Sequence, residues 1–290
     1  MVEGLGSAWW KRRGVVGKSA EVAKEWRIPD ELWERVEPLL PRVRRSKKGG
    51  RPRVPYRRVL DGIFYVLRTG IQWKAVPREF GSGSTLHHYF QQWVKLGVFR
   101  KLWQAGLLEY DGRHGIAWDW QSIDGAITKA PLGGEKTGPN PTDRAKSGTK
   151  RSLLTDGAGV PLAVVVSGAN THDKVLLAPT LASITIPRPR PTSTRPQNLC
   201  ADKGYDYPDI RQLVAHWGYT AHVKSRGQEE AERKVTPRYR ARRWVVERTH
   251  SWFNRFRRLL IRWEKKAENY LALLHFACAW VTFRATGVFG

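Results

Sequence analysis

Apolar residues recur at helical spacing through the first third of the chain. In residues 30–40 they follow the i, i+3, i+4 and i+7 pattern, which predicts an amphipathic helix with Asp30 as its N-cap. A second stripe of the same kind predicts a helix from residue 56 to residue 69, with Gly70 as its stop. The N-terminal part of the chain is therefore expected to be all-helical.

A short helix, a Gly-Ser turn at residues 81–83 and a longer helix from about Ser84 come next. This cadence is typical of a helix-turn-helix, in which the start of the second helix contacts bases. An ordinary helical bundle without DNA contact gives the same pattern. If the motif is present, the base-contacting side chains are Thr85, His87, His88 and Gln91.

Short apolar runs replace the helical pattern after about residue 118. "WQSIDGAI" predicts a first strand, and the Asp156-Gly157 turn predicts a hairpin whose second strand is rich in β-branched residues. "NLCADKGYD" and "YTAHVKS" predict two more strands. Helices are expected from Asn170 or Thr171, from Pro208, over residues 237–262 and over about 265–284. This alternation predicts a mixed α/β domain.

The charge of the chain is strongly unbalanced. A formal net charge of +25 over 290 residues and a pI of about 10.5 indicate a polyanionic partner, with nucleic acid as the first interpretation and an anionic membrane surface as the second. Cys200 and Cys278 have neither metal-ligand spacing nor a disulfide framework. Without a run of 18 apolar residues or a secretory signal, a cytoplasmic, nucleoid-associated location and no membrane partner are expected.

Basic residues are densest between residues 41 and 58, where nine occur without a single acid. Gly49, Gly50 and three prolines oppose one continuous helix, so this segment is interpreted as a basic arm. The DNA contacts expected from the arm are Arg51, Arg53, Arg57 and Arg58.

Three carboxylates stand at topologically related positions. Asp124 is expected to end the first predicted strand, and Asp202 follows the fourth predicted strand. Glu247 is the only carboxylate among nine arginines in the helix that is predicted after the fifth strand. Strand ends are where ligands collect in open α/β sheets, and two Mg²⁺ ions about 3.5–4 Å apart would neutralise such a cluster. The alternatives are a turn at Asp124, a helix N-cap at Asp202 and an ion pair of Glu247 with Arg243.

The segments "SIDGAITKA", "ADKGYD" and "RRWVVERTHSWFNRFRRL" resemble, in order, the three acidic motifs of DDE transposases of bacterial insertion sequences. The insertion sequence five family, within the wider four and five superfamily, is the best match, and the resemblance covers about residues 30–285. In the third motif Arg243 and Glu247 match, whereas Arg240 and Asn254 stand where the family has tyrosine and lysine.

The resemblance implies an RNase H-like mixed sheet with flanking helices, preceded by the helix-turn-helix-like domain. Its catalytic residues and ligands for two Mg²⁺ ions, with Mn²⁺ as an alternative, would be Asp124, Asp202 and Glu247. Further DNA contacts are expected from Arg243, Trp252, Arg255 and Arg258. The expected organisation is a basic tail (1–25), a DNA-binding domain (26–110) and a catalytic domain (115–290).

The implied activity is cleavage and transfer of the ends of an insertion sequence, with double-stranded DNA as partner and a homo-oligomer assembled on it. An inactive DNA-binding regulator and a nuclease of the same fold are the alternatives.

Overall fold

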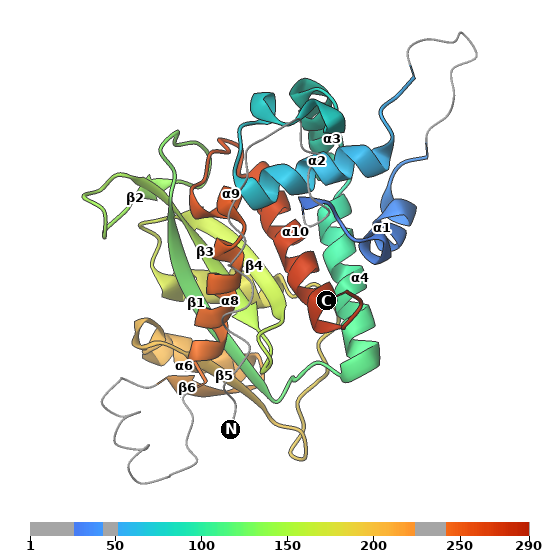
Figure 1. Cartoon of the computed structure of the whole chain (residues 1–290). Helices are drawn as coiled ribbons and strands as arrows, with labels where there is room; N and C mark the ends of the chain where they lie inside the picture. Colours follow the sequence, from blue (N-terminus) through green and yellow to red (C-terminus); the bar gives the residue numbers. More distant parts are fainter. Residues whose placement is uncertain (1–25, 43–51, 224–241, 290) are drawn as a thin grey trace, which may run out of the picture.

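The structure is a computed structural model that describes residues 26–42, 52–223 and 242–289 (Figure 1). Its N-terminal part is helical, as predicted. The helices are α1 (Asp30–Val36), α2 (Tyr56–Thr69), α3 (Gly83–Lys95) and α4 (Val98–His114). Gly70 ends α2 with a φ of 73°, a left-handed conformation that glycine adopts without strain. The predicted N-cap is wrong by one position, because Pro29 holds the cap and Asp30 is the first helical residue.

The connection between α2 and α3 differs from the predicted short helix. It contains two 3₁₀ turns, Trp73–Ala75 and Arg78–Phe80, and a Ser82 side chain that accepts a hydrogen bond from the backbone N–H of Thr85. Gly83 packs so closely on the carbonyl of Trp73 that a Cβ atom would lie 1.9 Å from that oxygen. The turn therefore has its own tight packing, and the helix-turn-helix remains a prediction.

A six-stranded mixed sheet occupies the second half of the chain (Figure 1). Its strands are β1 (Trp120–Lys129), β2 (Gly138–Pro139), β3 (Ser147–Thr155), β4 (Pro161–Gly168), β5 (Gln197–Ala201) and β6 (Tyr219–Val223). β4 pairs with β3, and β3 pairs with β1, and both pairings are antiparallel. On its other edge β1 pairs with β5, and β5 pairs with β6, and both of these pairings are parallel. The two-residue β2 extends the β3 edge. The predicted hairpin is confirmed as β3 and β4.

The helices of this half are α5 (Asp173–Ala182), α6 (Pro208–His216), α8 (Trp244–Asn254), α9 (Arg257–Leu260) and α10 (Ala267–Ala285). Pro208 begins α6 as predicted. The predicted caps of α5 are wrong: the ring of His172, rather than Asn170 or Thr171, accepts the N–H of Lys174.

The prediction of one continuous helix over residues 237–262 is also wrong for the described residues of that range, which begin at residue 242. The helix stops after Asn254, and Phe256 adopts extended backbone with φ −90° and ψ 93° so that its ring is buried. The short α9 then packs against α2, and Ile261 forms a bridge to Lys129 of β1. Residues beyond this break no longer share a helical face with Glu247.

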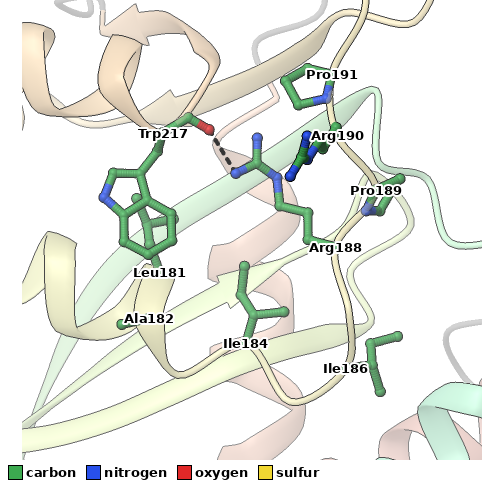
Figure 2. Close-up of a pocket in the computed structure, with 9 residues that line it drawn as sticks. All are labelled: Leu181, Ala182, Ile184, Ile186, Arg188, Pro189, Arg190, Pro191 and Trp217. Atoms are coloured by element: carbon green, nitrogen blue, oxygen red, sulfur yellow. Dashed lines mark hydrogen bonds between the residues drawn. The ribbon is translucent and has the colours of Figure 1, made fainter.

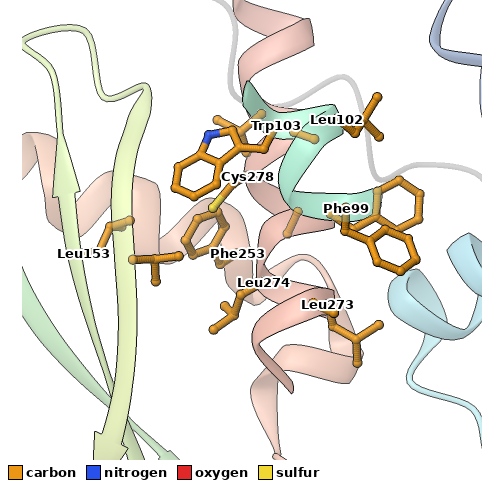
Figure 3. Packing of buried hydrophobic residues seen from close by; sticks show 14 of the residues in the cluster. Phe99, Leu102, Trp103, Leu153, Phe253, Leu273, Leu274 and Cys278 are labelled. Carbon is orange, nitrogen blue, oxygen red and sulfur yellow. The ribbon is translucent and has the colours of Figure 1, made fainter. Parts of the chain in front are cut away.

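The core runs without interruption from the helical part into the sheet. Figure 3 shows side chains of α4 and α10 meeting those of β3 and α8, and Figure 1 shows α10 between α4 and the sheet. Cys278 lies in this cluster, and both cysteines are buried and unbridged. The chain division near residue 110 therefore remains a prediction, since α4 and α10 share one core across it.

Candidate active site

The sheet register brings the first two carboxylates together. β1 and β5 are parallel, and Ser122 is level with Cys200. Two residues further along each strand stand Asp124 and Asp202, on the same side because side chains alternate with a period of two. Asp124 does not end its strand as predicted, because β1 continues to Lys129. This continuation also removes the alternative of a turn at Asp124.

Asp202 follows β5 directly, as predicted. Its Oδ1 atom accepts the backbone N–H of Gly204 at 2.8 Å and so caps the 3₁₀ turn Lys203–Tyr205. The alternative interpretation of Asp202 as an N-cap is therefore confirmed for this 3₁₀ turn. The bond also fixes the direction of the side chain, and a carboxylate has a second oxygen with which it can bind another group.

Glu247 lies in the first turn of α8. The side chain is 56% exposed, and its Oε1 atom is 3.3 Å from Nε of Arg243. The ion pair that the alternative interpretation foresaw is thus present. Because the Glu247 carboxylate is more than half exposed and its partner is one helix turn away, such a pair stabilises the fold by only about 0.3–0.5 kcal/mol.

The electrostatics of Asp124 link the three carboxylates. The pKa of its carboxyl is raised from 3.8 to about 7, mainly by burial and in smaller part by the charges of Asp202, Glu247 and Asp173, against an opposing bond from the backbone of Gly125. A raised pKa with several like-charged neighbours is typical of carboxylate clusters at functional sites. In residues 26–42, 52–223 and 242–289, however, no three His, Cys, Asp or Glu side chains are close enough to hold one metal ion in this arrangement.

A buried histidine and arginine beside Asp124 were missed by the sequence analysis. Nε2 of His250 is 3.9 Å from Oδ2 of Asp124. Burial, and then the charge of Arg151, lower the pKa of His250 to about 3, so the ring is neutral. Arg151 is 3% exposed, donates from Nη2 to Asn254 at 2.8 Å, and stacks on Phe253. β3 carries a lysine, serines and threonines beside Arg151, so its sequence holds no signal that sets this arginine apart.

A fourth carboxylate lies on the opposite face of β1. Asp173, in the first turn of α5, forms a partly buried pair with Lys150 at 3.1 Å. A Cβ atom at Gly125 would lie 2.2 Å from Oδ1 of Asp173, so the glycine after Asp124 lets α5 approach the strand. The interpretation that His172 and Asp173 set a helix start is confirmed.

The predicted DNA contacts fall into different environments. Arg258 is wrong as a surface contact, because it is 6% exposed and its Nε is 2.7 Å from Glu264. Arg57 lies 3.1 Å from Asp30 and 3.6 Å from Asp61, so its charge is largely neutralised. Among the predicted arginine contacts, Arg53, Arg58 and Arg255 are exposed and Arg51 lies outside the described residues, whereas Trp252 is half-buried.

The predicted contacts on α3 are polar but already engaged in part. Thr85 bonds to Ser82, and the exposed His88 bonds to Gln92. His87 is exposed, with its ring edge-on to Trp73. Gln91 donates to Asn269 of α10 at 2.8 Å and so joins the helical part to the C-terminal helix.

A separate hollow has a volume of about 460 Å³. Figure 2 shows the residues that line it. It lies between the end of α5, the segment after it and Trp217, and its wall is mainly apolar. Arg188 crosses it to donate to the carbonyl of Trp217 at 2.8 Å and stacks on Tyr219. None of the predicted site residues lines this hollow.

Among the described helices, none has the length and apolar character needed to cross a membrane.

Comparison with known proteins identifies two family matches in chain order. Residues 28–103 match the family described as "Putative transposase of IS4/5 family", and residues 111–282 match "Transposase DDE domain". The second match covers more than half of the chain and includes all three carboxylates.

Relatives from Burkholderia cepacia agree with these matches. The chain is 40% identical over 158 residues to "Putative transposase for insertion sequence element IS402", covering 52% of this chain and 72% of that protein. It is 36% identical to "Insertion element IS402 uncharacterized 16.2 kDa protein", covering 39% of this chain and 80% of that one. Among solved structures, the catalytic domain of Mos1 mariner transposase has 12% identity and a TM-score of 0.27, covering 66% of this chain and 93% of that domain. That likeness is too low to carry an argument.

Proposed function

The chain belongs to the DDE transposases of the IS4/5 type and is a DNA transposase, and we propose that it binds the terminal inverted repeats of its own insertion sequence and cuts and transfers those ends. We further propose that Asp124, Asp202 and Glu247 are its three catalytic carboxylates. The observation that carries this assignment is the raised pKa of Asp124, which the charges of the other two increase.

The strand order supports an RNase H-like core. Antiparallel β4, β3 and β1 continue into parallel β5 and β6, with α8 beside β1 (Figure 1). This arrangement presents Asp124 from the middle of the sheet, Asp202 from the end of the neighbouring strand and Glu247 from the covering helix. In this proposal three separate elements supply carboxylates to one region, which Glu247 reaches on turning from Arg243.

The carboxylates suit a hard divalent cation. Oxygen ligands are those that Mg²⁺ and Mn²⁺ prefer, and Asp124 is in a surrounding that disfavours its own negative charge. When bound, two Mg²⁺ ions would supply charge stabilisation for in-line displacement at phosphorus. In this chain Asp202 is held by its bond to Gly204, whereas Glu247 must turn from Arg243 toward Asp124 to complete the set.

Basic side chains near Glu247 are suited to hold the DNA. Arg255 is exposed and directly follows the last residue of α8, and Arg248 lies over the rings of Trp244 and Trp252 at 4.6 and 4.8 Å. A guanidinium pairs well with phosphate oxygens, and an indole can stack on a base. We propose that this face and the exposed arginines Arg53 and Arg58 bind double-stranded DNA, on which the chain assembles as a homo-oligomer.

The test is Glu247→Gln, with Glu268→Gln as its matched control. Both glutamates are about half exposed and each lies near a basic partner, but Glu268 is on α10 and pairs with Lys266 at 3.8 Å. Glutamine keeps size and helix propensity, so both variants should fold and bind inverted-repeat DNA in a gel shift. Mg²⁺-dependent nicking should fall on the order of 10²–10³-fold for Glu247→Gln alone, by analogy with loss of one electrostatic stabiliser.

Normal nicking by Glu247→Gln would remove Glu247 from the catalytic set. Nicking by the wild-type chain without joined products would instead identify a nuclease, and binding without nicking would identify a regulator. A labelled 3′ end distinguishes these outcomes, because strand transfer moves the label to a larger product.

A further inference from the structure

We propose that His250 is a positioning residue that holds the Asp124 carboxylate from behind, so that one oxygen is oriented for the metal ions. This inference rests on the proposed function, because it assumes that Asp124 is a metal ligand. His250 itself contacts neither metal nor DNA in this arrangement.

The geometry places the imidazole beside the carboxylate and away from solvent. Nε2 lies 3.9 Å from Oδ2 of Asp124, and the side chain is 8% exposed against 25% for Asp124. Both ring nitrogens are buried without a hydrogen bond of normal geometry, and the backbone of Asp124 lies near enough to raise the pKa of the ring against the larger effect of burial. A buried N–H without an acceptor is costly, so a small rotation of the Asp124 side chain that brings Oδ2 into hydrogen-bond range is favoured.

Arg151 is a second buried group whose charge acts on the ring. Its Nε and Nη1 atoms have no hydrogen-bond partner. Its positive charge disfavours an imidazolium, so a ring with a single proton is favoured. Arg151 is held in turn by Asn254 and by the ring of Phe253. The ring is therefore suited to carry its one proton on Nε2, facing Asp124.

Such a contact has a specific consequence for metal binding. A carboxylate ligand whose second oxygen accepts a hydrogen bond loses less orientational freedom when an ion binds, and partners of this kind typically contribute 10–100-fold to metal affinity. The helix geometry supports the same assignment, because Glu247 and His250 are three residues apart on α8 and lie on adjacent parts of one face. One helix would then supply a ligand and the support of a second ligand.

The experiment measures Mn²⁺ binding to the full chain without DNA, by calorimetric titration. His250→Phe keeps the ring volume and removes the donor, and it should weaken Mn²⁺ binding roughly 10–100-fold. His250→Gln, whose amide nitrogen reaches the position of Nε2, should stay within a few-fold of wild type. His250→Asn, which reaches only the position of Nδ1, should resemble the phenylalanine variant and serves if that variant does not fold.

His275→Phe is the matched control. His275 is a second histidine whose pKa burial lowers to about 3, but it lies on α10 with its ring against Trp103. Its replacement should leave Mn²⁺ affinity unchanged. In an Asp124→Asn background, His250→Phe should cause little further loss, since the carboxylate that the histidine orients is already gone.

Wild-type affinity in His250→Phe, or equal losses in the glutamine and asparagine variants, would overturn the positioning role while leaving the carboxylate assignment intact. Unchanged Mn²⁺ affinity in Asp124→Asn would overturn the carboxylate assignment itself, and the positioning role with it.

Discussion

The raised pKa of Asp124 predicts that this residue destabilises the metal-free fold. A carboxyl with a pKa of about 7 in the folded chain and 3.8 when unfolded binds its proton more tightly in the folded state. Folding stability therefore falls as pH rises from about 4 to about 7, and the loss is complete above that range. The gap corresponds to about 4 kcal/mol, because each tenfold change in proton affinity is worth ~1.4 kcal/mol.

Asp124→Asn should recover most of this loss, because the amide stays neutral at every pH of the range. In urea unfolding with EDTA, the variant should exceed wild type by about 4 kcal/mol at pH 8 and by only about 1.5 kcal/mol at pH 5. Added Mg²⁺ should stabilise wild type alone, since ligand binding to the folded state raises its stability. A variant no more stable than wild type at pH 8, or a difference that does not shrink at pH 5, would refute the reasoning.

Two further predictions separate arginines that support the fold from those that hold DNA. Arg258→Met should lower unfolding stability by about 3–5 kcal/mol, because it leaves Glu264 buried without its partner, whereas Arg255→Met should leave stability unchanged and weaken DNA binding in a gel shift. Replacement of both Arg53 and Arg58 by glutamine should reduce the slope of log affinity against log salt concentration by about 1.8. Arg57→Gln should leave this slope unchanged, and it should lower the stability of the fold because the pair of Arg57 with Asp61 is lost. A slope that changes with Arg57 but not with Arg53 and Arg58 would contradict this division.

The sequence predicted those features that depend on local pattern. Periodicity identified α2, the β3–β4 hairpin and α6 at nearly their observed bounds, because each has a clear apolar repeat and its own stop signal. The break after Asn254 was not predictable in this way. Phe256 leaves the helix to bury its ring in a core built from distant segments, and local propensity contains no information on that packing.

The same limit applies to the site. Asp124 and Asp202 could be paired from sequence because each belongs to a recognisable strand, but their register required the sheet. The partners of Asp124 on either side, His250 and Asp173, come from helices that only tertiary packing brings to the strand. Arg258 was misplaced for the related reason that helical spacing was extended across the break.

Several arginines of the segment around Glu247 have structural roles. Arg258 neutralises a buried Glu264, and the fully buried Arg262 donates to backbone carbonyls such as those of Glu135 and Lys136. Arg248 also bonds to a backbone carbonyl, at Ala158, while its guanidinium faces two indoles. Part of the positive charge in this segment thus organises the fold and does not reach the surface. The number of arginines in the sequence therefore overstates how many can bind DNA phosphates. Fewer positive charges reach the surface near Glu247 than the sequence indicates. Glu247 is paired in this segment with Arg243 of its own helix turn at 3.3 Å, and this pair is the contact that Glu247 would give up on turning toward Asp124.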